Sequence, residues 1–123
     1  MITIVAVCSD LLFQSRVVEQ AKRLGYAASV AETADELREA LEGDVALVAL
    51  DLHVNGIDWR EAVSAAKERG VPLLAFGRHT EVSLLREARA AGCDRVVARS
   101  TLVEELPDLI TGLASAPAIL PSE

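Results

Sequence analysis

The chain has 123 residues, a length that fits one domain built around one hydrophobic core. Hydrophobic residues make up 51% of it and charged residues 25%, which leaves ample apolar material for a core and excludes wholesale disorder. The formal net charge is −7, so a nucleic acid or an anionic membrane surface is disfavoured as a partner.

Short apolar runs alternate with longer segments of helical spacing. Apolar runs predict strands at 2–7, 45–50, 71–76 and 96–98, and the small residues of 27–31 predict a weaker strand at an edge of the sheet. The segments between and after these runs carry apolar residues at helical intervals: Val17, Ala21 and Leu24; Trp59, Ala62, Val63 and Ala66; Leu84, Ala88 and Ala91; Leu102, Leu106, Leu109 and Leu113. The order is therefore five strand-then-helix units.

Capping residues mark where these helices begin and end. Predicted N-caps, each followed by a glutamate three residues later, are Thr33, Asp58 and Thr101, and Asp10 is the expected N-cap of the first helix. Predicted left-handed residues just beyond helix ends are Gly25, Gly43, Gly70 and Gly92. Pro107 leaves two alternatives open: it interrupts the hydrogen bonding of the last helix, or it marks that helix's true start.

Five such units predict an α/β fold with a doubly wound parallel sheet of strand order 2-1-3-4-5, the flavodoxin-like (βα)₅ three-layer sandwich. We expect one domain over 1–115 and a disordered tail over 116–123, too short for an output domain. In this topology functional groups gather beyond the carboxyl ends of the first and third strands. Cys8, Ser9 and Asp10 follow the first strand, and Asp51 follows the third.

The sequence also bears on whether the protein is secreted or inserted in a membrane. No apolar run is long enough to span a bilayer, and the N-terminus has no basic region or cleavage site of a secretion signal. The two cysteines, Cys8 and Cys93, give no disulfide framework. We therefore expect a cytoplasmic protein.

Three local phrases occur in the order and spacing of one known family. The segment 45–58, with Asp51 at its centre, resembles the third strand, phosphoacceptor aspartate and following loop of the receiver domains of two-component response regulators. The segment 89–99 is similar to the run that leads to their fifth strand, and 24–26 to the end of their first helix. The resemblance covers nearly the whole chain and implies a signalling module with Asp51 as the phosphoacceptor.

The other groups that the family's chemistry needs are altered. The two acids that help to bind Mg²⁺ fall on Cys8 and Ser9, and Asp10 lies one position too late. Gly77 stands where the family has a hydroxyl, Val96 where it has a switch aromatic, and Arg99 where it has a lysine; Ser100 replaces the proline that usually follows that lysine. The resemblance is thus to an atypical member, a pseudo-receiver.

These replacements predict weak or absent phosphorylation. Mg²⁺ prefers carboxylate and water oxygens in octahedral geometry, and Asp51 is the one evident anionic ligand, a doubtful metal site by itself. Phosphoryl transfer depends on the metal to neutralise developing charge. Arg99 can instead pair bidentately with Asp51 and fix one conformation. We expect no cofactor, with Mg²⁺ bound only if Asp51 is phosphorylated, and no enzymatic activity.

Two alternatives stay open. One is a working receiver phosphorylated at Asp51 in a phosphorelay, with Asp10 swung inward. The other is a flavodoxin-like cofactor binder or a Cys8-dependent enzyme, although no phosphate-binding loop follows the first strand and position 14, where a C-x₅-R loop would need arginine, is Gln14. Asp51 could also merely cap its loop, and His53 and His79 are expected to be solvated loop residues.

The expected partners are signalling proteins, possibly a histidine kinase or an output protein. Five arginines against three acids make the region from Arg78 to Arg99 locally basic within an acidic protein. In receivers, the fourth helix, fifth strand and fifth helix commonly make dimer and output contacts. The resemblance therefore implies that surface for partner binding and for a possible homodimer, although a mixed solvated face explains the charges equally well.

Overall fold

The structure is a computed structural model that describes residues 2–114. Its five strands form one parallel sheet of order β2-β1-β3-β4-β5, as the sequence predicts. The strands are β1 (Thr3–Val7), β2 (Ala27–Ala31), β3 (Val45–Asp51), β4 (Leu73–Gly77) and β5 (Arg95–Ala98). The predicted end of the domain at 115 and the predicted tail over 116–123 lie outside the described residues.

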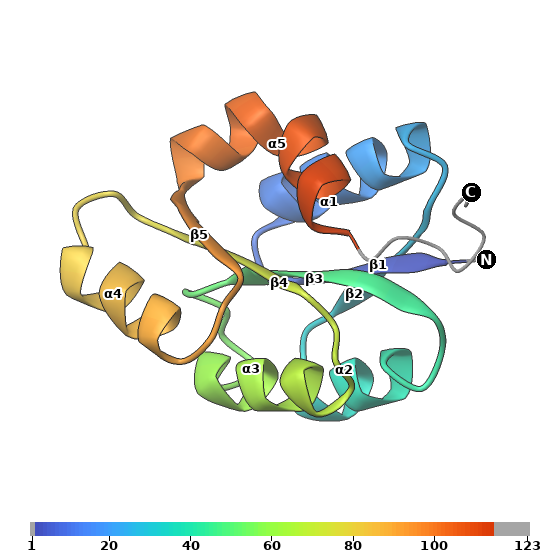
Figure 1. The fold of residues 1–123 in the computed structure, drawn as a ribbon, viewed down its shortest axis with the longest axis horizontal. Helices are drawn as coiled ribbons and strands as arrows, with labels where there is room; N and C mark the ends of the chain where they lie inside the picture. Colours follow the sequence, from blue (N-terminus) through green and yellow to red (C-terminus); the bar gives the residue numbers. More distant parts are fainter. Residues whose placement is uncertain (1, 115–123) are drawn as a thin grey trace.

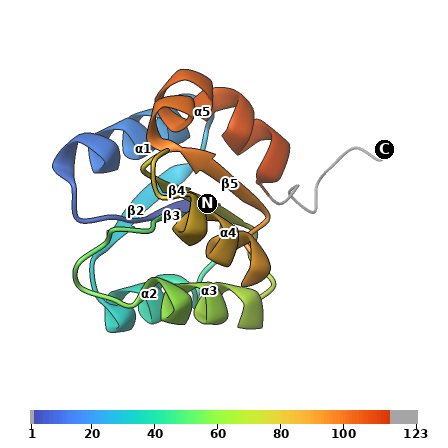
Figure 2. The ribbon, with the colours of Figure 1, turned by 90° about the vertical axis from the view of Figure 1, so that its left-hand side faces the viewer.

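Five helices cover the two faces of the sheet. They are α1 (Leu11–Arg23), α2 (Ala34–Ala40), α3 (Trp59–Glu68), α4 (Val82–Ala90) and α5 (Arg99–Leu113). Helices α1 and α5 lie together on one face, and α2, α3 and α4 line the other (Figure 1). The view along the sheet in Figure 2 shows the three layers. This is the predicted doubly wound sandwich.

The central strands β1, β3 and β4 are buried on both faces, which explains their largely apolar sequences. Alternate residues of β1 serve opposite cores: Ile4 and Ala6 pack with α1 and α5, whereas Val5 and Val7 pack on the side of α2 and α3. The same alternation in β3 directs Leu47 and Ala49 toward α1 and α5. Aliphatic side chains therefore fill both cores, with Phe13 and Phe76 as an aromatic pair at 5.4 Å between ring centroids.

Most of the predicted helix signals are confirmed. The carboxylate of Asp10 accepts the N–H groups of Leu12 and Phe13, and the side chains of Thr33 and Asp58 cap α2 and α3. Three of the four predicted glycines are left-handed, with φ of 91° at Gly25, 67° at Gly70 and 107° at Gly92. At these positions any other residue would strain the backbone.

Two local predictions are wrong, and one alternative is settled. Gly43 is not left-handed, because α2 ends at Ala40 and the chain turns at Leu41 in the ordinary helical region. Thr101 is not an N-cap, because α5 begins two residues earlier, directly after β5, without a side-chain cap. Pro107 lies inside α5, so it removes one intrahelical hydrogen bond rather than starting the helix.

None of the helices within residues 2–114 is both long enough and apolar enough to cross a membrane.

Candidate functional site

Asp51 is the last residue of β3 and lies at the predicted crevice edge of the sheet. Cys8 follows β1 at the same edge, since Val7 of β1 pairs with Leu50 of β3. Within residues 2–114, Asp51 is one of two buried polar residues, and it is only 2% exposed. Cys8 is fully buried. The structure thus brings the two predicted residues together, and it covers both of them.

Neighbouring groups hold both carboxylate oxygens of Asp51. Oδ1 accepts the backbone N–H of His53 at 2.8 Å, and the guanidinium Nη2 of Arg99 lies 3.6 Å from the same oxygen. The thiol of Cys8 donates to Oδ2 at 3.5 Å. The carboxylate is therefore an ion-paired, hydrogen-bonded group inside the fold. This fits its role as a cap of its own loop, because it closes the turn at His53.

Arg99 is the first residue of α5, and its side chain lies across the site. Its guanidinium carbon is 5.1 Å from the ring centroid of Phe13, a distance at which the cation is attracted to the ring face. The predicted pairing with Asp51 is confirmed, but the bidentate geometry is wrong: one guanidinium nitrogen approaches one oxygen at 3.6 Å. The contact with the Phe13 ring gives a physical reason, since it attracts the same guanidinium.

Cys8 serves as a hydrogen-bond donor rather than as a nucleophile. Its burial, helped by the charges of Asp51 and Asp10 and opposed by a hydrogen bond to the backbone of Asp10, raises the pKa of the thiol from 9.0 to about 12. At neutral pH the sulfur therefore keeps its proton, whereas nucleophilic cysteines depend on the thiolate. This environment speaks against the Cys8-dependent enzyme.

The side chains of Ser9 and Asp10 both form hydrogen bonds with the backbone of nearby loops and helices. The hydroxyl oxygen of Ser9 accepts the backbone N–H of Asn55 at 3.0 Å, which ties the loop after β1 to the loop after β3. The carboxylate of Asp10 accepts the N–H of Leu12 at 2.9 Å as the cap of α1. Asp10 points at the start of its own helix and is exposed. An inward swing of Asp10 would break that cap.

The loop between β3 and α3 is further fixed by a close approach to the loop after β2. A side-chain carbon at Gly56 would overlap the carbonyl oxygen of Glu32, so only glycine fits there. The buried side chain of Gln14 donates to the carbonyl oxygen of Cys8 at 2.6 Å and to the Glu32 carboxylate at 3.4 Å. Three loops are thus joined around the buried carboxylate. The sequence did not predict these contacts.

The predicted switch positions, Gly77 and Val96, lie in packed surroundings. Gly77 ends β4, and a side-chain carbon there would stand 3.4 Å from methyl groups of Leu52 and Leu85. Val96 is 6% exposed and belongs to the core on the side of α3 and α4. Neither residue has a side-chain group that could donate a hydrogen bond to a phosphoryl oxygen.

His53 is not the solvated residue that the sequence predicts, whereas His79 is exposed. The His53 side chain is 19% exposed, and its Nε2 lies 2.9 Å from Oε1 of Glu81, just before α4. Arg78 approaches the same oxygen at 3.7 Å. This cluster connects the loop after β3 to the start of α4. A histidine two residues after a strand and a glutamate 28 positions later carry no local signal of their contact.

The donors near Asp51 do not suit the Mg²⁺ that working receivers use. Magnesium requires hard oxygen ligands. Here the thiol of Cys8 is soft and protonated, the hydroxyl of Ser9 is occupied, and Asp51 already has three neighbours. Within the part of the chain that the structure describes, no group of three or more His, Cys, Asp or Glu residues could hold a metal. Asp51 alone is a poor magnesium site.

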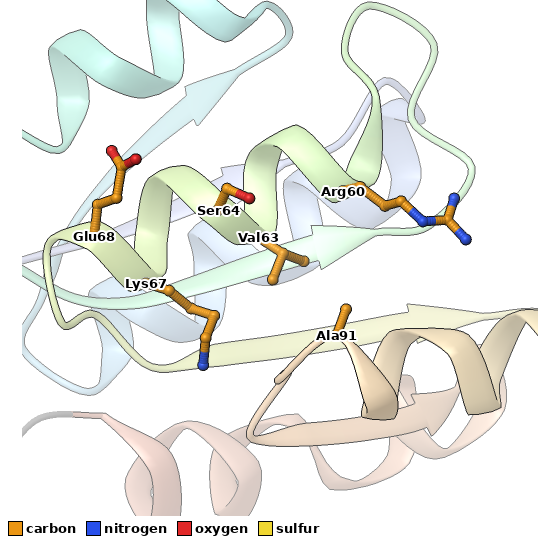
Figure 3. A pocket seen from close by; sticks show the side chains of 6 residues that line it. All are labelled: Arg60, Val63, Ser64, Lys67, Glu68 and Ala91. Atoms are coloured by element: carbon orange, nitrogen blue, oxygen red, sulfur yellow. The ribbon is translucent and has the colours of Figure 1, made fainter.

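A groove of about 610 Å³ lies elsewhere, between α3 and α4, and is lined by Arg60, Val63, Ser64, Lys67, Glu68 and Ala91. Figure 3 shows that Val63 and Lys67 project from α3 toward the side on which Ala91 lies, whereas Glu68 projects away. The groove lies on the other face of the sheet from Cys8, which packs with α1 and α5. It therefore does not extend the Asp51 site.

No family model matches the sequence, and no curated protein matches it either.

Solved structures match closely in fold. A CheY-like response regulator receiver domain protein from Methanospirillum hungatei has a TM-score of 0.76 at 19% identity, covering 91% of this chain and 92% of that one. The receiver domain of NtrX from Brucella abortus gives 0.79 at 17% identity over 89% and 96%. Chemotaxis protein CheY4 from Vibrio cholerae gives 0.76 at 17% identity over 92% and 98%. The chain therefore has the fold of response-regulator receiver domains, as the resemblance implies.

Proposed function

We propose that this chain is an atypical receiver-like module of a two-component-type signalling pathway, acting in the cytoplasm through protein contacts and with weak or no phosphorylation of Asp51. The proposal rests on the burial and the contacts of the Asp51 carboxylate. The carboxylate is 2% exposed, and Cys8, His53 and Arg99 hold its two oxygens. A phosphodonor has to approach one of those oxygens before it can react.

The charge balance of the site supports the same conclusion. In a working receiver the metal neutralises the negative charge that develops on the phosphoryl group. Here one guanidinium, that of Arg99, supplies the nearby positive charge, and the acid pair that would recruit a metal is missing. We therefore expect no resident cofactor, and Mg²⁺ only if Asp51 is phosphorylated.

Readout of a phosphoryl group would also be impaired. A hydroxyl at position 77 and an aromatic at position 96 normally respond to it, and Gly77 and Val96 cannot. The β3–α3 loop is tied to its neighbours through Ser9 and through Gly56, which favours a single arrangement of the crevice. A module of this kind would present one constant surface to its partners.

For that surface we propose the exposed side of α4, β5 and α5, with a histidine kinase or an output protein as the partner. Arg86 and Arg95 are exposed on it, and Val82 at the start of α4 is 52% exposed. A groove of about 480 Å³ runs beside Val82 and is lined by Thr80, Glu81, Val82, Ser83, Leu84 and Glu87. The exposed Arg86 and Arg95 are basic, whereas the groove beside Val82 contains Glu81 and Glu87, so the face has charges of both signs and suits a partner with apolar residues and a mixed-charge surface.

The proposal is tested by incubating the protein with Mg²⁺ and a small phosphodonor, and by measuring the intact mass. Asp51→Asn is the matched control, and an active receiver treated in parallel shows that the donor works. We expect no gain in mass on a sample that is folded by circular dichroism. A gain of one phosphoryl group that the control lacks would instead establish the second candidate, a working receiver phosphorylated at Asp51.

A further inference from the structure

The two edge strands of the sheet differ in how they are protected. β5 has four residues, among them the exposed Arg95, and the side chain of Arg89 lies against it, 3.5 Å from the carbonyl oxygen of Val96. Short length and charge are usual devices against edge-to-edge pairing. β2, with the sequence Ala-Ala-Ser-Val-Ala, has five residues without a charge or a proline. The β2 edge therefore lacks the protection that β5 has.

The hydrogen-bonding groups exposed along β2 can be assigned from its ladder with β1. The N–H of Ala27 bonds to the carbonyl oxygen of Ile2, so Ala27, Ser29 and Ala31 face β1 and the residues between them face outward. Within residues 2–114, the N–H and C=O groups of Ala28 and Val30 form no hydrogen bonds. Beyond the strand, Glu36 caps the N–H of Glu32 at 2.7 Å. The open edge thus consists of Ala28 and Val30.

Two outward-facing residues separated by one inward-facing residue suit pairing with an identical strand. In an antiparallel arrangement with a two-fold axis at Ser29, Ala28 of one copy lies opposite Val30 of the other. Each such pair exchanges two backbone hydrogen bonds, which gives four in all. The side chains are small and half-buried, so they allow a second strand to approach.

The charges at the two ends of β2 favour this antiparallel partner. Lys22 and Arg23, in the last turn of α1, precede the strand; both are exposed, and Arg23 also lies 3.7 Å from the carboxylate of Glu19 on the same helix. Glu32 and Asp35, also exposed, follow it. Antiparallel pairing places the basic end of each strand beside the acidic end of the other, whereas parallel pairing would place like charges together. The pattern is self-complementary, as a two-fold interface requires.

We propose that the β2 edge is a homodimerisation surface, on which a second copy of this chain adds its own β2 antiparallel to form one continuous sheet. The surface lies away from α4, β5 and α5 and does not depend on the state of Asp51. The module would then present two copies of its signalling face at once. The contact is short, and each copy carries a net charge of −7, so we expect a weak, reversible dimer.

Sedimentation velocity of the full chain tests this from about 10 μM to about 1 mM, where weak interfaces associate. The salt concentration should be about 0.15 M, at which charges are screened beyond about 8 Å. We expect the weight-average mass to rise from monomer toward dimer. Val30→Pro removes an outward N–H that the monomer does not use and should weaken association at least about tenfold. Ser29→Ala keeps every outward group and should dimerise normally.

A charge exchange provides the second set of variants. Lys22→Glu and Asp35→Lys should each weaken the dimer, and the double variant should recover it because opposite charges again face each other. Lys67→Glu, on α3, is the matched control and should change nothing. A chain that stays monomeric throughout would overturn the proposal, as would a dimer that neither Val30→Pro nor the single charge variants affect.

Discussion

Replacing Asp51 by asparagine should destabilise this protein, and the sign of the change is informative. In a site with three clustered acids, removing one carboxylate relieves repulsion between like charges and raises stability. Here the acid pair is absent, and Asp51 is instead paired with Arg99 and hydrogen-bonded by His53. The same substitution therefore removes attraction rather than repulsion.

The magnitude follows from the contacts. A hydrogen bond to a charged group, such as that from the His53 N–H at 2.8 Å, contributes about 1.5–3 kcal/mol. Asparagine keeps an oxygen acceptor for that N–H, so only part of this is lost. Arg99 is 26% exposed and 3.6 Å away, so solvent limits its pairing to about 1 kcal/mol. We expect Asp51→Asn to lower the free energy of unfolding by about 1–2 kcal/mol, and Asp51→Ala by about 3 kcal/mol.

Urea unfolding followed by circular dichroism measures these values, since the midpoint and slope give the free energy of unfolding. Asp44→Asn is the matched control, because Asp44 is exposed and its side chain forms no hydrogen bond or ion pair with the part of the chain that the structure describes. It should change stability by less than about 0.5 kcal/mol. An Asp51→Asn variant more stable than the parent would refute the attractive environment that we derive for the carboxylate.

Three further predictions concern the surroundings of the site. Gly56→Ala should cost about 2 kcal/mol in urea unfolding, because the added carbon overlaps the Glu32 carbonyl oxygen; an unchanged stability would show that the loop is free to move. Gly77→Ser should cost no more than about 1 kcal/mol, because the added carbon would lie 3.4 Å from the methyl groups of Leu52 and Leu85. This variant should yield no phosphorylated protein by intact mass, since the acid pair is still missing; phosphorylation of it would contradict us. The thiol of Cys8 has a pKa of about 12 in the folded protein against 9.0 in the unfolded chain. Its contribution to the free energy of unfolding is therefore complete below pH 9. That contribution declines as the pH rises toward 12, by up to about 1.4 kcal/mol per pH unit. In a Cys93→Ser background, Cys8→Ala should flatten that alkaline decline, and an equally steep decline would exclude Cys8 as its source.

The fold was predictable because its signals are local. Apolar runs flanked by helical spacing fix the order of the elements, and side-chain caps such as Asp10 and Asp58 mark the helix starts. The prediction for Gly43 failed because a glycine after a helix is not by itself evidence of a left-handed residue. Thr101 failed because β5 continues directly into α5 and leaves no turn to cap.

The position of the site was predictable from the sequence, but the contacts between the loops around it were not. Asp51 ends β3 and Cys8 directly follows the neighbouring β1, so the topology brings them to one edge. The bond from Asn55 to Ser9 joins residues 46 positions apart, and His53 meets Glu81 across 28 positions. Periodicity reports which face a residue occupies, but it carries no information on which distant loop that residue touches. The burial of Asp51 depends on such contacts and could only be seen in the structure.

The central claim is that the oxygens of the Asp51 carboxylate are buried and already bonded, so that they do not accept a phosphoryl group. Beryllofluoride with Mg²⁺ tests it most directly, because this tetrahedral species binds an accessible aspartate as a phosphoryl group does and needs no donor chemistry. Amide NMR spectra of the labelled protein, recorded during a titration, would report binding at His53 and Asn55. We predict no saturable change in those amide signals. A saturable shift that Asp51→Asn abolishes would contradict the account and show that the site opens.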